Sequence, residues 1–168
     1  YEQAVSNGFD AATTAKALRG LNDAISQRQV KPAGDGAKLL PLIASADASV
    51  SSGAILLAGS MAAEAALPEL ISKSSAQSPA RLAAIDALGN FAAPAARDAL
   101  VAAADAKSPA DVRSRAVLAL ARNHRATAVP LIADYAASLT DAEQARSFWH
   151  QALSSKGMSK QLAEVLKD

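Results

Sequence analysis

A pattern that recurs about every 30 residues constrains this chain more than any other feature of its sequence. The pair Ala54-Ile55 recurs as Ala84-Ile85 and again as Ala116-Val117, at spacings of 30 and then 32 residues. A fixed period of this length is typical of stacked supersecondary units. The same two spacings relate two further sets of positions: Ala66, Ala96 and Ala128, and then Leu70, Leu100 and Ile132.

The composition predicts that these units are helical. About a quarter of the residues are alanine, the best helix former, and aromatic residues make up only 4%. Apolar residues never alternate over a sustained stretch, so strands are not expected. Ser-Pro and Thr-Asp pairs are read as helix starts, with the hydroxyl capping a free backbone N–H. Helices are predicted near 10–29, 49–60, 62–76, 79–90, 93–107, 109–122, 125–138, 141–156 and 159–167, with a short one around Leu39–Ile43.

These helices predict an all-α fold, a short right-handed α-α superhelix of stacked hairpins. Two short helices cannot bury their apolar stripes alone, and stacking makes one continuous core. Residues 1–168 are expected to form one domain. Within it, 1–35 are expected to be an N-terminal helical extension, 36–139 the repeats and 140–168 a C-terminal capping hairpin.

Charge and cysteine usage exclude several kinds of function. The net charge of +1 gives no electrostatic case for binding nucleic acid. The apolar run Ala54–Ala58 is too short to insert into a membrane. The absence of cysteine excludes disulfides, thiolate zinc, iron–sulfur clusters and covalent haem within these residues, and it suits an exported protein. Because the chain begins at Tyr1 without a signal peptide, we expect a processed product or a piece of a longer protein.

No pattern of catalytic or metal-binding residues stands out. His124 and His150 lie 26 residues apart, without the close spacing of paired metal ligands, so each is expected to be structural. Serine is plentiful, but no nucleophile elbow is present. The pair Gly34 and Gly36 follows no predicted strand, so it is not a phosphate-binding fingerprint. We therefore expect no catalytic residue, no metal and no cofactor in this region.

The segment 108–121 resembles the first helix of a HEAT-like repeat of the phycobilisome-lyase type. It contains Asp111, Val112-Arg113, Ala116 and Leu120 in the family's order. Residues 78–90 and 50–59 match less fully, since the first lacks the valine and the second has a serine in place of the arginine. The resemblance implies a repeat module that binds other proteins or neighbouring domains. It also implies that Arg81 and Arg113 tie adjacent repeats together.

The resemblance implies that the second helices line a concave side. On their outer faces we expect partner contacts from Arg97, Asp98, Asp134 and Tyr135, with Tyr135 as an aromatic anchor. These residues could equally be ordinary surface positions. The cluster Arg113, Arg115, Arg122 and Arg125 is either a docking patch or a solvated face balanced by Asp105, Asp111 and Asp134.

The tail carries a second resemblance. Residues 148–153, with Lys156-Gly157 and Leu162-Ala163, are similar to the end of the helical region in large planctomycete and verrucomicrobial dehydrogenase-like proteins. That resemblance implies a c-type haem domain outside this chain. Trp149 is expected either to close the last repeat or to meet a following domain.

The predicted function is a non-catalytic HEAT-like module for protein–protein or inter-domain interaction that is part of a larger protein. The resemblance of the tail implies that this larger protein is an exported, haem-bearing dehydrogenase-like one. The alternative is an accessory lyase-like domain that binds a cofactor-sized ligand in its concave cleft. There, Tyr135 and nearby charges would contact the ligand.

Overall fold

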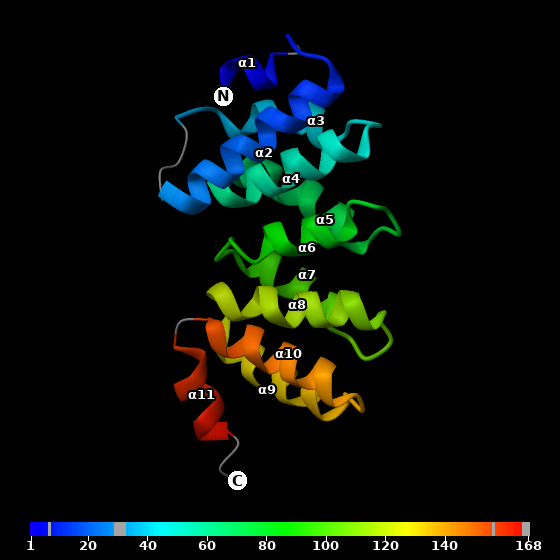
Figure 1. Cartoon of the computed structure of the whole chain (residues 1–168), viewed down its shortest axis with the longest axis vertical. Helices are drawn as coiled ribbons and strands as arrows, with labels where there is room; N and C mark the ends of the chain where they lie inside the picture. Colours follow the sequence, from blue (N-terminus) through cyan, green and yellow to red (C-terminus); the bar gives the residue numbers. More distant parts are fainter. Residues whose placement is uncertain (7, 29–32, 156, 166–168) are drawn as a thin grey trace.

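A computed structural model of the chain describes residues 1–6, 8–28, 33–155 and 157–165, and within these ranges it contains helices and no strand (Figure 1). The last part of the helix predicted for 159–167 lies outside the described residues. The α-helices are α1 (Glu2–Val5), α2 (Ala11–Arg28), α3 (Leu40–Ile43), α4 (Ala48–Met61), α5 (Leu67–Ser75), α6 (Arg81–Leu88), α7 (Pro94–Ala103), α8 (Ala110–Asn123), α9 (Arg125–Ala137), α10 (Ala142–Ser154) and α11 (Met158–Val165). Short 3-10 turns, η1 (Gly36–Leu39) and η2 (Glu64–Ala66), lead into α3 and α5.

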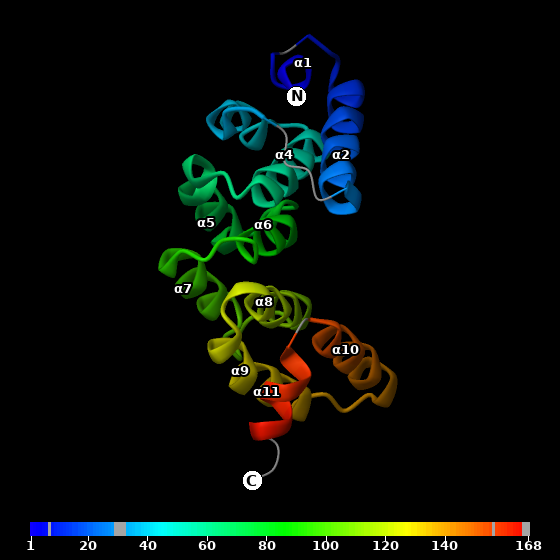
Figure 2. The ribbon, with the colours of Figure 1, turned by 90° about the vertical axis from the view of Figure 1, so that its left-hand side faces the viewer.

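The helices form two layers along an elongated stack, so the predicted all-α repeat fold is confirmed (Figure 2). The first helices α4, α6 and α8 follow one another in one layer, and α5, α7 and α9 follow one another in the second. The helix α2, expected in an N-terminal extension, packs against α4 in the same way that α4 packs against α6. It is therefore the first member of the first-helix layer.

The repeated apolar positions occupy equivalent buried places. Ile55, Ile85 and Val117 on the first helices are each 0% exposed. Leu70, Leu100 and Ile132 on the second helices are equally buried. Together they form one cluster that runs through the whole stack, because each unit supplies apolar surface to the next.

Two glycines set how closely the first helices approach. A Cβ added to Gly59 on α4 would lie 2.6 Å from the Cα of Ala87 on α6. A Cβ added to Gly89, at the end of α6, would lie 2.9 Å from the carbonyl oxygen of Ala119 on α8. No side chain larger than hydrogen fits at either place without a backbone shift. The small residues thus let successive helices meet backbone to backbone.

Aspartate caps four helix starts in the described chain, whereas serine or threonine was expected. The Asp47 carboxylate accepts hydrogen bonds from the N–H groups of Ser49 and Val50 at the start of α4. Asp10, Asp35 and Asp141 make the same kind of contact at α2, η1 and α10. The hydroxyl of Ser78 caps nothing: it is buried without a hydrogen-bond partner in the described residues. A carboxylate satisfies the free N–H groups and also favours the positive end of the helix dipole.

Large side chains join the C-terminal helices α10 and α11 to the stack. Phe148 on α10 is 4% exposed and its ring lies edge-on to Tyr135 of α9, with centroids 4.7 Å apart. Met158 and Leu162 of α11 are also buried. Trp149, expected as the closing residue, is only partly buried, because it lies one position round the helix from Phe148. No helix in the described ranges combines the length and the apolar character that a membrane span requires.

Candidate functional site

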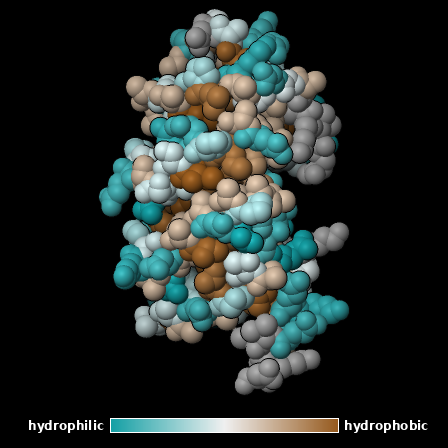
Figure 3. Space-filling model, turned by 180° about the vertical axis from the view of Figure 1, so that it is seen from behind, coloured by the Kyte–Doolittle hydropathy of each residue, from teal (hydrophilic) through white to brown (hydrophobic). Residues whose placement is uncertain are grey.

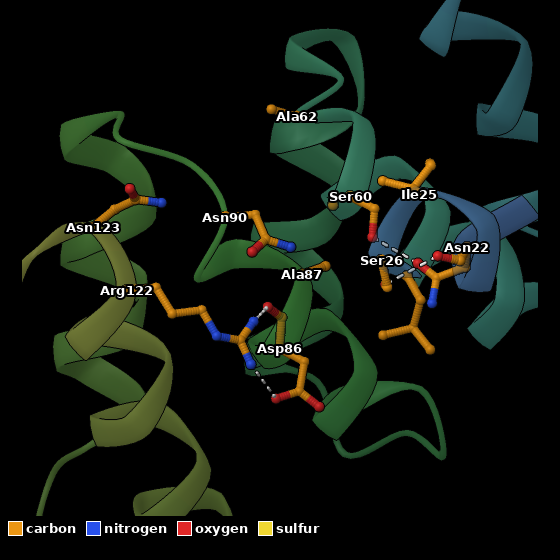
Figure 4. Close-up of a pocket in the computed structure, with 12 residues that line it drawn as sticks. Asn22, Ile25, Ser26, Ser60, Ala62, Asp86, Ala87, Asn90, Arg122 and Asn123 are labelled. Carbon is orange, nitrogen blue, oxygen red and sulfur yellow. Dashed lines mark hydrogen bonds and ion pairs between the residues drawn. The ribbon is translucent and has the colours of Figure 1, made fainter. Parts of the chain in front are cut away.

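A hollow crosses the first-helix layer. It has a volume of about 560 Å³ and runs over α2, α4, α6 and α8 (Figure 4). We call it the first-helix groove. The polar side chains that line it are Asn22, Ser26, Ser60, Asp86, Asn90, Arg122 and Asn123, and the apolar ones include Ile25 and Leu56.

One carboxylate ties α6 to α8 on this face. Asp86 Oδ2 accepts a hydrogen bond of 2.6 Å from Nη1 of Arg115, and its Oδ1 lies 3.8 Å from Nη2 of Arg122. Arg122 also donates from Nη1 to the backbone carbonyl of Asp86, at 2.9 Å. A second hollow of about 500 Å³ continues past these charges toward α10. The two arginines of the predicted basic cluster that face these hollows therefore share Asp86. Asp105, Asp111 and Asp134, the expected balance, make no ion pair among the described residues.

Side-chain amides form the rest of the groove wall. Asn123 Nδ2 donates to the carbonyl of Gly89 at 2.9 Å, which fixes its side chain. The Ser60 hydroxyl donates to Oδ1 of Asn22 at 2.6 Å and fixes that amide. Asn90 lies between them, and its side chain makes no hydrogen bond to the described residues. The wall thus presents a row of amide groups with unused donors and acceptors.

The residues predicted to contact a partner lie elsewhere, on the second helices. Arg97 and Asp98 of α7 form an exposed ion pair with each other, at 2.8 Å. Asp134 of α9 is exposed as well. The structure does not bring these residues into the first-helix groove.

Tyr135 is not an exposed anchor, so that expectation is wrong. It is only 7% exposed, and its ring lies beside Phe148 and beneath the guanidinium of Arg113, whose Cζ is 5.2 Å from the ring centroid. Positions 128, 132 and 135 follow a helical spacing of four and three residues, so Tyr135 shares the buried face of Ala128 and Ile132.

The resemblance implied a concave side lined by the second helices, but the two hollows described above lie on the first-helix side. There, α2 and α10 project on either side of α6 and α8 (Figure 2). The second-helix face shows a row of apolar patches between polar side chains (Figure 3). Its hollow between α5, α6 and α7 is smaller, about 280 Å³, and is lined by Ile71, Arg81 and Ala99 among others.

The two arginines that the resemblance assigned to links between repeats, Arg81 and Arg113, make different contacts. Arg81 Nε donates to the carbonyl of Ser74 at 3.0 Å and so links α6 to the preceding hairpin, as the resemblance implied. Arg113 instead reaches Ser138, at 3.3 Å, and the Tyr135 ring, both on the second helix of its own unit.

Titratable groups in the groove do not gather into a metal site: the described residues contain no group of three or more His, Asp or Glu side chains placed to hold an ion. His124 Nε2 lies 2.9 Å from the carbonyl oxygen of Phe91, a structural contact, and His150 is exposed on α10. The shifted pKa values are far from the groove, at the N-terminal end. There, burial and then the Asp35 carboxylate raise the pKa of the Tyr1 hydroxyl, and the hydrogen bond that Lys38 donates to the Glu2 carboxylate raises the pKa of Lys38.

Comparison with known proteins identifies the repeats. The family model described as HEAT repeats matches residues 36–121, which is half of the chain. No curated protein and no solved structure matches. The matched segment begins at η1 and ends in α8, and so covers the hairpins whose buried positions recur in register. The chain therefore belongs to the HEAT-repeat family.

Proposed function

We propose that this chain is a non-catalytic interaction module that holds a partner protein, or a neighbouring domain of the same protein, in its first-helix groove. The observation that carries the proposal is the groove wall. There, α2, α4, α6 and α8 present hydrogen-bonding side chains toward one hollow. HEAT repeats form helical modules that are often used for protein interaction.

The rigidity of the groove supports this role. Backbone contacts at Gly59 and Gly89 fix the spacing of α4, α6 and α8, while Asp86 fixes two of the arginine side chains. A binding surface whose side chains are already held loses little conformational entropy when a partner docks. Arg97 and Asp98 also pair with each other, but the Asp98 carboxylate is 66% exposed, whereas that of Asp86 is 23% exposed.

Photo-crosslinking from each face tests this proposal. The photoreactive amino acid p-benzoyl-phenylalanine replaces Asn90 in one variant and Asp98 in a second, and each is expressed in cells that carry the natural gene. We expect a discrete adduct with a polypeptide from position 90, and none from position 98. If position 98 alone gives the adduct, the partner binds the second helices. If neither position gives an adduct, the proposed function is wrong.

The second-helix face is the alternative docking surface, with Arg97, Asp98 and Asp134 as its polar contacts. Val101 of α7 is 37% exposed, and the apolar patches of Figure 3 run along this face. A partner bound here would cover apolar side chains between charged ones, which is a common arrangement at protein interfaces.

A cofactor-sized ligand is a second candidate occupant of the first-helix groove. Its volume of about 560 Å³ is within the range of small-molecule sites, roughly 300–1,000 Å³. Such sites are mostly apolar, whereas this wall is mainly amide, hydroxyl and charged groups. A visible absorption band in the purified protein would favour the ligand over the protein partner.

We also propose that this module is part of a larger protein, and only the resemblance of the tail supports this proposal. A haem-bearing, exported dehydrogenase-like parent requires a Cys-x-x-Cys-His motif in the same reading frame. Sequencing the gene beyond the codon for Asp168 tests this, and a stop codon there would remove the haem-bearing parent while leaving the interaction module intact.

A further inference from the structure

The amide row of the first-helix groove points to one kind of ligand. Asn22 comes from α2, Asn90 follows α6, and Asn123 ends α8, so the amides succeed one another along the stack (Figure 4). Ser60 and Asn90 occupy the same place in successive repeats, one residue after Gly59 and Gly89. The equivalent position in the next repeat is Arg122, so the repeat register brings a polar side chain to the groove from each of the three repeats.

Each amide retains atoms that a ligand can use. Asn123 uses one N–H on Gly89, which leaves its Oδ1 and its second N–H. Asn22 uses Oδ1 on Ser60, which leaves its Nδ2. A side-chain amide offers both a carbonyl acceptor and N–H donors, the same pair of groups that a peptide unit carries.

The spacing of the helices suits an extended chain. Packed helices lie about 8–10 Å apart, and the glycine contacts place these first helices at the close end of that range. Two or three residues of an extended polypeptide span about 7–10 Å. The amides of Asn90 and Asn123, which come from the neighbouring helices α6 and α8, therefore match peptide groups two or three residues apart in such a chain.

The charges in the groove do not select a strongly charged ligand. Asp86 and Arg122 are the charged residues on its wall, and they already contact each other. None of the side chains that line the groove in the described structure is aromatic, so no ring is offered for a sugar to stack on. A neutral hydrogen-bonding ligand with a regular repeat is favoured, and the peptide main chain has these properties.

We propose that the first-helix groove binds an extended polypeptide segment through its main chain, with Asn90 and Asn123 as the principal contacts. This inference rests on the proposed function, because it names the form in which the partner enters the groove. Ile25 and Leu56 supply apolar contact for alternate side chains of the segment. Recognition through the main chain gives a broad sequence tolerance.

A displayed library of random linear 12-residue peptides, selected on the full 168-residue chain, tests the inference. The affinities of selected peptides are then compared by fluorescence anisotropy for wild type, Asn90→Ala/Asn123→Ala and the control Arg97→Ala/Asp98→Ala. We expect at least a tenfold loss for the amide pair and less than a twofold change for the control. N-methylation of alternate peptide nitrogens should weaken binding similarly, while single side-chain truncations in the peptide should change it little.

The single variant Asn90→Ala separates a loss of binding from a folding defect. Asn90 makes no side-chain hydrogen bond to the described residues, so its removal should leave the fold unchanged. Circular dichroism of each variant checks the fold. If no linear peptide is enriched, or if enriched peptides bind the amide variants as well as wild type, the inference is overturned. A crosslink from position 90 with no peptide binding would overturn the extended segment but leave a folded partner in the groove. Binding of oligosaccharides on a glycan array in place of peptides would overturn it too.

Discussion

The centre of the stack and its C-terminal end are held together by opposite kinds of side chain. In the centre, Gly59 meets Ala87 and Gly89 meets Ala119, with no room for a methyl group at the glycines. At the end, the rings of Tyr135 and Phe148 lie 4.7 Å apart and Met158 is fully buried. An internal repeat has a similar neighbour on each side, so small residues in register bring backbones together. At the C-terminal end of the described chain, α9 meets α10 and α11 in place of a further repeat in register, and bulky side chains make these contacts.

The largest effect is expected at the C-terminal end. Phe148→Ala removes a ring that is 4% exposed and should lower the free energy of unfolding by about 3–5 kcal/mol. A urea melt followed by circular dichroism measures it. The control Leu153→Ala, on the same helix but 47% exposed, should change stability by less than about 0.5 kcal/mol. A loss below about 1 kcal/mol for Phe148→Ala would mean that α10 and α11 do not fold cooperatively with the repeats.

In the centre, Leu120→Ala should cost about 2–5 kcal/mol, because the side chain is 0% exposed and its removal leaves a cavity. Leu88 is buried to the same degree one repeat earlier, so Leu88→Ala should give a similar loss. The same melt compares all three core variants. If the leucine variants lose under half a kilocalorie, the stacked core does not supply the stability assigned to it.

Replacing glycine by alanine within a helix usually stabilises a protein, but the glycine contacts predict the opposite effect at Gly59. Gly59→Ala would place a methyl group 2.6 Å from the Cα of Ala87 and should destabilise the chain by about 1–3 kcal/mol. Gly20 on α2 is the matched control, since nothing lies within 4 Å of its added Cβ. Gly20→Ala should therefore stabilise by about 0.5–1 kcal/mol. Equal effects of the two substitutions would contradict the close backbone contact in the centre.

The repeats could be predicted from sequence because their signal is local and periodic. Ile55, Ile85 and Val117 recur at a fixed spacing, and a position that recurs in a repeat has the same surroundings each time. The burial of Tyr135 is equally predictable, because Tyr135 follows the buried residues Ala128 and Ile132 at helical spacing. The expectation of an exposed aromatic anchor overlooks this spacing.

The groove could not be predicted in the same way. Asp86 contacts Arg115 and Arg122, which are 29 and 36 residues further along the chain. Contacts of this kind depend on how far each hairpin is rotated relative to the last, and the rotation follows from packing at Gly59 and Gly89. Sequence proximity instead suggested Asp105, Asp111 and Asp134 as partners for the arginines.

A smaller effect is expected from the charges that link the first helices. Asp86→Ala removes the carboxylate shared by Arg115 and Arg122, and the guanidinium groups are nearly half exposed. Solvent screening limits the loss to about 1 kcal/mol or less. Urea melts at low and at high salt should show this loss shrinking as salt rises. A loss that is independent of salt would mean that Asp86 acts by packing and not by charge.

The smallest effect is expected at the N-terminal end, where a single polar contact caps the start of α2. The backbone N–H of Thr13 donates to the Asp10 carboxylate at 2.7 Å, and this hydrogen bond is the main cause that lowers the pKa of Asp10. Because the pKa of Asp10 is lower in the folded state than in the unfolded state, its ionisation stabilises the fold at pH values above the unfolded-state pKa. This stabilisation is lost as the pH falls through the folded-state pKa.

The variant Asp10→Asn keeps a capping side chain that does not titrate. The difference in free energy of unfolding between wild type and Asp10→Asn should be constant near neutral pH and change in favour of the variant as pH falls below about 4. A difference that stays constant across this range would show that α2 does not depend on the ionised cap, and that the N-terminal end is held by its buried apolar residues, as the centre is.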